Sequence, residues 1–211
     1  MKLCLIISLL FICNNYLFAQ QNKTSIAKIN GISYQATLIN KSRSLIIKAG
    51  DKVIIHLDSA GVWDFKFVDF DRDGYKDLLI EYVSNTPGDN NLFLYSKQKR
   101  NFMTVKNFVS FSSAKILGNN NLYYSYERAG CSDLKWDSSL FKIVNFKAIE
   151  LGRISGLGCK GDEKIGIFIS KINGEKERLV KKYPIDEIEK YRKYKWGFIK
   201  HYWSSNYSKF L

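Results

Sequence analysis

The stretch from Asp69 to Asp77 constrains this chain more than any other part of its sequence. It reads DFDRDGYKD, with acidic residues at positions 1, 3, 5 and 9 and a glycine at position 6. Carboxylates this close in sequence repel one another unless a cation lies among them. Calcium takes about six to eight oxygen ligands, and the glycine allows the sharp turn that folds the chain around the ion. The loop therefore predicts a calcium site whose ligands are Asp69, Asp71, Asp73, Asp77 and the backbone carbonyl of Tyr75.

The residues on both sides of this loop predict strands. Trp63, Phe65 and Phe67 alternate with other residues before it, and a run rich in β-branched and aromatic residues follows it to Val83. A helix-flanked calcium loop needs a glutamate at position 12, where this chain has Ile80. We therefore expect a strand–loop–strand site that Asp77 closes. The alternative is an acidic turn that forms without a metal, since Asp and Gly favour turns.

The pattern DxDxDGxxDL is matched at every position from Asp69 to Leu78. It resembles the calcium loops of FG-GAP (integrin-type) and VCBS repeats, and the resemblance implies a bound calcium ion. Such motifs usually come in arrays, whereas this sequence has one copy. The resemblance therefore covers the metal loop and does not imply a multi-blade propeller.

Residues 1–19 have the pattern of an export signal. A lysine near the start is followed by an apolar run from Leu3 to Ile12, and Ala19 is the small residue expected at a cleavage site. The apolar run is too short for a good membrane span. We therefore expect residues 20–211 to form one exported domain without a transmembrane segment, either periplasmic or extracellular. The alternative is a lipid anchor at Cys13, although isoleucine is a poor residue before a lipidated cysteine.

Two cysteines remain once the export signal is removed. Cys131 and Cys159 form an isolated pair without a nearby histidine, so a zinc site of the ordinary type is excluded. A pair of this kind in an exported protein most simply forms a disulfide. We expect a Cys131–Cys159 bridge.

The rest of the chain predicts a mainly β fold, an antiparallel sandwich or meander with one C-terminal amphipathic helix. About a dozen short apolar runs alternate with turn residues, and helical periodicity is almost absent before residue 184. Beyond Pro184, apolar residues recur at helical spacing to Trp203. We expect a helix over about 184–203 that docks on the sheet. The expected strands are 32–39, 44–48, 52–57, 63–68, 77–83, 92–96, 102–105, 122–128, 140–144, 148–154 and 164–171.

The chain is strongly basic, with a formal net charge of +13. Its lysines are scattered and have acidic residues nearby, and an exported protein rarely meets nucleic acid. We therefore expect no nucleic-acid partner. The positive surface favours anionic envelope polymers.

No arrangement of residues in the sequence predicts a catalytic centre. The chain has no HExxH, no phosphate-binding glycine loop and no CxxC. We therefore expect no enzymatic activity and no catalytic residues. The alternative is a secreted hydrolase with a structural calcium ion, because the carboxylate pair of a glycoside hydrolase meets only in the fold. Its carboxylates would come from Glu81, Glu127, Asp133, Asp137 and Glu150.

The segment 123–131, YYSYERAGC, is the best candidate for partner binding outside the loop. Tyrosine and arginine are frequent in recognition surfaces. A disulfide at Cys131 would stiffen the segment and lower the entropy lost on binding. We expect Tyr126 and Arg128 to contact a partner, and the alternative is an aromatic strand that ends in a glycine turn.

The export signal, the single calcium loop in a small β domain and the cysteine pair together resemble a further group. It comprises the periplasmic i-type lysozyme inhibitors and their calcium-binding relatives associated with type IV secretion. The resemblance implies a non-enzymatic protein whose partner is a lysozyme or another envelope hydrolase. No inhibitory motif matches residue by residue, and two basic proteins associate slowly. A component of a cell-surface adhesin is a third reading.

Overall fold

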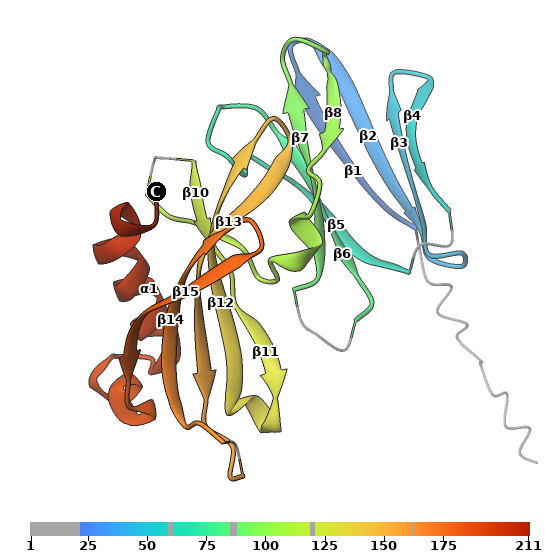
Figure 1. Ribbon diagram of the computed structural model, residues 1–211. Coiled ribbons are helices and arrows are strands. Elements are labelled where there is room, and N and C mark those ends of the chain that lie inside the picture. Colours follow the sequence, from blue (N-terminus) through green and yellow to red (C-terminus); the bar gives the residue numbers. More distant parts are fainter. Residues whose placement is uncertain (1–21, 59–60, 85–87, 119–120, 162) are drawn as a thin grey trace, which may run out of the picture.

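The computed structural model describes residues 22–58, 61–84, 88–118, 121–161 and 163–211, so the expected export signal lies outside the described residues. Three antiparallel sheets and a C-terminal helix make up the fold (Figure 1), which confirms the mainly β prediction. The first sheet has the order β1 (Lys23–Ile29), β2 (Ile32–Ile39), β3 (Ser44–Ala49), β4 (Lys52–Leu57). The second has the order β5 (Val62–Val68), β6 (Asp77–Tyr82), β7 (Asn90–Ser96), β8 (Asn101–Thr104).

The third sheet is larger and holds the rest of the strands. Its order is β15 (Lys176–Tyr183), β14 (Gly166–Asn173), β13 (Lys147–Leu157), β12 (Lys135–Val144), β10 (Leu122–Tyr124), β9 (Lys115–Ile116), and β11 (Glu127–Gly130) also pairs with β12. All the strand pairs in the three sheets are antiparallel. Strand β15 was not expected from the sequence, because its residues are mostly charged and all but Tyr183 are exposed.

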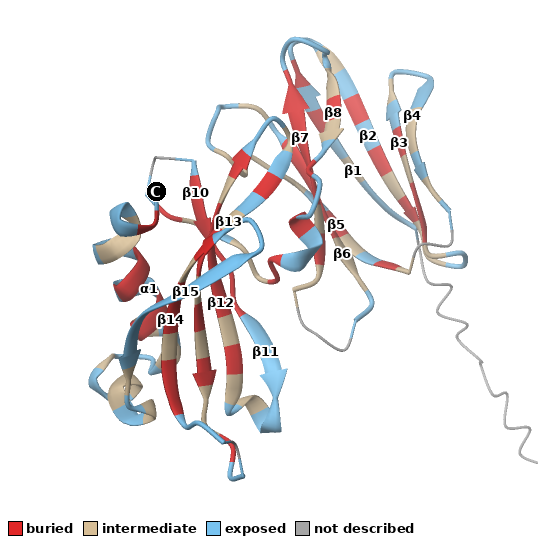
Figure 2. Cartoon of the chain, viewed as in Figure 1, coloured by how far each residue is buried: buried red, intermediate tan, exposed pale blue. Residues whose placement is uncertain are grey.

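The second sheet is the middle layer of the molecule. Its strand β6 is buried on both faces, as the buried colour along the central strands in Figure 2 illustrates. Leu78 and Ile80 pack into an apolar cluster with the first sheet, whereas Leu79 packs with Phe141 of the third sheet. A strand buried on both faces loses the alternation of apolar and polar residues, which explains the continuous apolar run after Asp77.

The C-terminal segment packs on the far face of the third sheet. Helix α1 (Lys195–Asn206) is followed by the 3₁₀ helix η4 (Tyr207–Phe210). Phe198 and Trp203 are buried in one cluster with Trp136 of β12, and the indole N–H of Trp203 donates to Ser138 Oγ at 2.9 Å. The helix therefore docks on the sheet as expected.

The single helix expected over about 184–203 is wrong in one respect, because the segment is broken. A 3₁₀ helix, η3, covers Ile185–Lys190, and α1 begins at Lys195. Lys193 and Tyr194 between them have positive φ angles of 73° and 50°. The Arg192 carbonyl lies very near Gly197: a Cβ added to Gly197 would be 2.2 Å from the Arg192 oxygen. Gly197 thus permits the tight turn that separates the two helices.

Candidate metal centre

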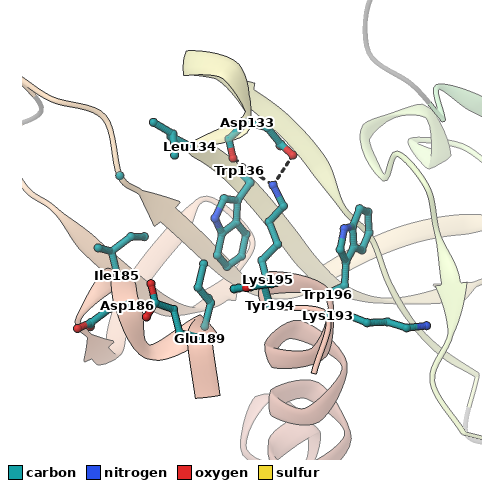
Figure 3. Close-up of a pocket in the computed structure, with 12 residues that line it drawn as sticks. Asp133, Leu134, Trp136, Ile185, Asp186, Glu189, Lys193, Tyr194, Lys195 and Trp196 are labelled. Carbon is teal, nitrogen blue, oxygen red and sulfur yellow. Dashed lines mark hydrogen bonds and ion pairs between the residues drawn. The ribbon is translucent and has the colours of Figure 1, made fainter. Parts of the chain in front are cut away.

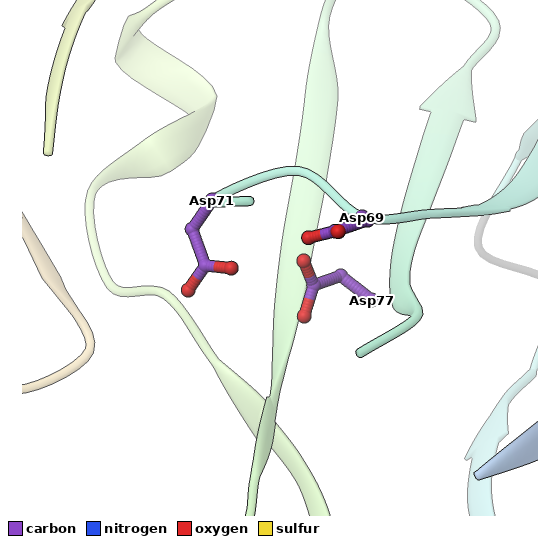
Figure 4. Close-up of side chains that lie close together, drawn as sticks. All are labelled: Asp69, Asp71 and Asp77. Atoms are coloured by element: carbon purple, nitrogen blue, oxygen red, sulfur yellow. The ribbon is translucent and has the colours of Figure 1, made fainter. Parts of the chain in front are cut away.

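Three carboxylates of the Asp loop converge where β5 leads into β6. Asp69, Asp71 and Asp77 each offer an oxygen, and these oxygens lie within 4.8 Å of one another (Figure 4). Within the described ranges, no other group of three or more acidic, histidine or cysteine side chains converges in this way. The structure therefore brings together three of the four carboxylates expected from the sequence.

Backbone N–H groups of the loop fix the directions of the carboxylates. Asp71 Oδ1 accepts from the N–H of Asp73 at 3.2 Å, and Asp69 Oδ2 accepts from the N–H of Gly74 at 3.2 Å. Gly74 has φ 92°, a conformation that favours glycine. The loop thus closes on itself because of the residue types that its sequence supplies.

Asp77 is the most deeply placed of the three carboxylates. It is 1% exposed, and it accepts the backbone N–H of Phe70 at 2.8 Å and that of Tyr95 at 2.9 Å. The pKa of Asp77 is raised to about 7, chiefly by burial. The two hydrogen bonds act to lower this pKa, and the nearby charges of Asp71 and Asp73 act to raise it. Through Tyr95 the loop is attached to β7 as well as to β6.

The residues fit a hard cation. Asp69 Oδ1 is buried and has no hydrogen-bond partner among the described residues. Burial also raises the pKa of Asp71, and the charges of Asp73 and Asp69 act in the same direction. A cation among these oxygens would satisfy the orphan acceptor and offset the repulsion.

Asp73 and Tyr75 remain predictions as ligands. Asp73 Oδ1 accepts the N–H of Tyr75 at 2.8 Å, and its Oδ2 lies 3.6 Å from Lys97 Nζ. The Lys97 ammonium also lies 4.4 Å from the centre of the Tyr75 ring. The negative charge of Asp73 is thus partly neutralised by Lys97, a residue outside the loop that the sequence analysis did not connect with it.

The loop also contacts the third sheet, which sequence reasoning missed. The Phe70 ring stacks on Tyr123 of β10, with centroids 5.2 Å apart, and Arg72 Nη1 donates to the Gly118 carbonyl at 3.4 Å. The Tyr123 hydroxyl is buried without a hydrogen-bond partner among the described residues. Its pKa is raised by burial and by the charges of Asp71 and Asp77. Phe70, the aromatic residue at position 2 of the loop, was the sequence feature that could have indicated this contact.

The expected disulfide is confirmed, and the expected partner contact at Tyr126 is wrong. Cys131 and Cys159 are bonded, with Cα atoms 6.2 Å apart. Tyr126 is 5% exposed, because the chain between β10 and β11 places its ring against Trp196, with centroids 3.8 Å apart. Its hydroxyl donates to Asp133, so the side chain belongs to the core rather than to a surface.

Arg128 and Asp133 continue this arrangement at the surface. Arg128 is exposed, and its Nε lies 3.7 Å from Asp133 Oδ1. Asp133 belongs to the short helix η2 (Cys131–Asp133) and also accepts from Lys195 of α1, through both its carboxylate and its carbonyl, the latter at 3.1 Å. The segment 123–131 therefore leads into η2, whose Asp133 lines a pocket, and Arg128 remains a predicted partner contact.

This pocket, which we call the helix pocket, lies between η2, η3 and the start of α1 (Figure 3). Its volume is about 470 Å³. Figure 3 shows Trp136 in its floor, with Lys195 reaching across to Asp133 and with Asp186 and Glu189 on the η3 side. The lining residues are Asp133, Leu134, Trp136, Gly158, Ile185, Asp186, Ile188, Glu189, Lys193, Tyr194, Lys195 and Trp196.

A second pocket is lined by three of the five carboxylates that were considered as catalytic residues of a hydrolase. Glu127, Asp137 and Glu150 line it, and its volume is about 440 Å³. Glu127 and Asp137 are directly paired on β11 and β12. Burial raises the pKa of both groups, and the Asp137 charge raises that of Glu127 further. We call this the sheet pocket.

The third carboxylate of the sheet pocket is held by an arginine and a serine. Glu150 Oε2 accepts from Arg153 Nη2 at 2.7 Å, and its Oε1 accepts from Arg153 Nε at 3.0 Å and from Ser139 Oγ at 2.7 Å. The two carboxylates left over, Glu81 and Asp133, lie in other parts of the molecule.

Comparisons with known proteins were made at the level of families, curated sequences and solved structures. No protein-family model matches the chain, and no curated protein matches it. A chain described as "Structure of a Xanthomonas Type IV Secretion System related protein" is similar with a TM-score of 0.48 and 13% identity, over 77% of this chain and 95% of that chain. Within the described residues, no helix is both long enough and apolar enough to cross a membrane.

Proposed function

We propose that the protein is an exported, calcium-braced β protein that binds a protein or envelope-polymer partner and catalyses no reaction. The observation that carries the calcium part is the convergence of Asp69, Asp71 and Asp77 around a buried, unpartnered oxygen of Asp69. The disulfide fits export, because such bonds persist in oxidising compartments. A lysozyme or another envelope hydrolase is the partner that the sequence resemblance suggests.

The position of the loop supports a bracing role for calcium. Its carboxylates connect the end of β5, the start of β6 and the N–H of Tyr95 on β7, and its Phe70 ring packs on the third sheet. An ion there would hold the second sheet in register and against the third sheet. The ion supplies positive charge to the cluster, and the chain supplies the fixed oxygens.

A melting experiment tests the calcium site. Calcium at a few millimolar should raise the melting temperature above the value in chelator, with a dissociation constant of about 10⁻⁴–10⁻³ M, as in extracellular modules. Asp71→Asn should remove the calcium response, whereas Asp51→Asn in the exposed β3–β4 turn should keep it. Equal melting temperatures with calcium and with chelator would contradict the proposal.

The sheet pocket favours a secreted hydrolase as the second candidate function. Its paired carboxylates, Glu127 and Asp137, both have raised pKa values, as a general acid requires. Hydrolysis of peptidoglycan or another glycan by the folded protein, abolished by Asp137→Asn with the melting temperature unchanged, would establish this alternative. If the native protein hydrolyses no glycan, the hydrolase alternative is wrong and the binding function is the better hypothesis.

A further inference from the structure

We propose that the helix pocket binds an arginine side chain, together with a flanking apolar residue, from a protein partner. This inference rests on the proposed binding function and gives it a partner chemistry. The pocket has the size and the lining typical of ligand sites, which are mostly apolar with a few converging polar groups.

The walls of the pocket suit the aliphatic stem of a long side chain. The Trp136 ring lies in the floor, with Ile185 on one side and Leu134 on another (Figure 3). Ile188 of η3 also belongs to the lining. Leu134 is 53% exposed, and Trp196 at the edge is 39% exposed. Large apolar side chains left this open at the mouth of a pocket gain free energy when a partner covers them.

The charges around the pocket favour a cation. Asp133 is already paired with Lys195 and Arg128. Asp186, Glu189 and Lys193 also line the pocket. In the described part of the chain no ion pair joins either carboxylate to a cation, although the Asp186 charge acts on Lys190, whose ion-pair partner is Glu187. The lining holds three carboxylates and two lysine ammonium groups, so it carries one excess negative charge on a protein of net charge +13.

Arginine fits this combination better than lysine does. Its guanidinium is planar, is weakly hydrated, stacks on aromatic rings and donates in a fork to carboxylates. The exposed tryptophan ring of the pocket is that of Trp196, which is 39% exposed and has the Lys115 ammonium 5.2 Å from its centre, whereas Trp136 in the floor is 2% exposed. Asp186 and Glu189 supply carboxylates in the same lining. A compact, strongly hydrated ammonium would lose more hydration on entering the same space.

The pocket is also held in shape before any partner arrives. The Cys131–Cys159 bridge ties η2 to the end of β13, and the N–H of Gly158 donates to the Leu134 carbonyl at 3.1 Å. A Cβ on Gly158 would lie 3.2 Å from that carbonyl oxygen and 3.3 Å from Ile185 Cγ1. Since little has to be ordered on binding, more of the contact free energy appears as affinity.

The test is a titration of the folded, disulfide-bonded protein with short peptides followed by ¹H–¹⁵N NMR. Acetyl-Leu-Arg-Leu-amide should shift the indole N–H signals of Trp136 and Trp196 more than those of Trp63 and Trp203. The peptide with citrulline, which has the same shape without the charge, should bind at least about tenfold more weakly. The lysine peptide should bind more weakly than the arginine peptide, and the glutamate peptide should not bind.

Matched charge changes locate the site. Asp186→Asn with Glu189→Gln should weaken the arginine peptide about tenfold, while Glu163→Gln with Glu175→Gln, both exposed and outside the pocket lining, should leave its affinity unchanged. Equal binding of the citrulline peptide, tighter binding of the lysine or glutamate peptide, or shifts confined to other tryptophans would overturn the inference. No calcium or natural partner enters this titration, so its failure is distinct from failure of the calcium site.

Discussion

At the scale of single residues, Asp133 is the most connected carboxylate of the helix pocket. Burial opposes its ionisation, but hydrogen bonds from Lys195 and Tyr126 outweigh that effect, and Arg128 adds to them, so the pKa of Asp133 is lowered. A lowered carboxyl pKa stabilises the fold at pH values above the ordinary pKa of about 4. This contribution is lost as the pH falls through the folded-state pKa.

We expect Lys195→Met to lower the free energy of unfolding by roughly 1–2 kcal/mol at pH 7, as for a charge-assisted hydrogen bond. The difference from the native protein should shrink when the pH falls below 4 and Asp133 takes up a proton. Urea unfolding at pH 7 and pH 3 measures it, with Lys193→Met as the control. A difference that is the same at both pH values would contradict the role given to this pair.

Two buried tyrosines offer a matched comparison. The Tyr123 hydroxyl has no partner among the described residues, whereas that of Tyr126 donates to Asp133. An unpartnered buried hydroxyl costs about 1–3 kcal/mol. Tyr123→Phe should therefore raise the free energy of unfolding in chelator by about 1 kcal/mol, and Tyr126→Phe should lower it. Urea unfolding of both variants checks this, and a loss of stability in Tyr123→Phe would show that its hydroxyl has a partner.

At the scale of elements, the sequence predicted strands well where one or both faces are buried. β2, β3 and β6 lie close to the expected ranges because burial selects their apolar residues. β15 lies at the edge of the third sheet, where its charged residues reach solvent, so neither alternation nor an apolar run marks it. The break before α1 could not be predicted either, because it depends on the contact between Gly197 and the Arg192 carbonyl.

Gly197→Ala tests that contact. Alanine normally stabilises a helix by about 1 kcal/mol relative to glycine. Here the added Cβ would lie 2.2 Å from the Arg192 oxygen, so the turn or the helix has to shift. We expect a loss of about 1–3 kcal/mol in the free energy of unfolding. Ser204→Ala, exposed on the same helix, is the control and should be neutral or stabilising; a stabilised Gly197→Ala protein would mean that the close approach is not needed.

At the scale of the whole molecule, the two candidate sites lie on opposite faces of the third sheet. The metal loop packs against the face that carries Tyr123 and Phe141, and the helix pocket lies on the face that carries Trp136 and that α1 covers. The acidic spacing revealed the first site because all its carboxylates come from nine consecutive residues. The helix pocket combines β12, η3 and α1 with a disulfide, and no local pattern indicates that such distant segments meet.

This separation predicts that stability and binding respond to different changes. Chelator should lower the melting temperature but leave the dissociation constant of the arginine peptide unchanged at temperatures where the protein stays folded, because the ion braces the opposite side of the sheet. Replacing both Cys131 and Cys159 by serine should do the reverse. The bridge holds one wall of the pocket, so peptide binding should weaken several-fold while calcium still raises the melting temperature.

Calorimetric titration and thermal melting of the same samples measure the two responses. The comparison is made well below the lower of the two melting temperatures, so that the folded fraction is equal in every sample. If chelator weakens the peptide as strongly as loss of the disulfide does, the metal loop and the helix pocket are coupled through the third sheet. In that case the ion acts on recognition as well as on stability, and the bracing role alone is wrong.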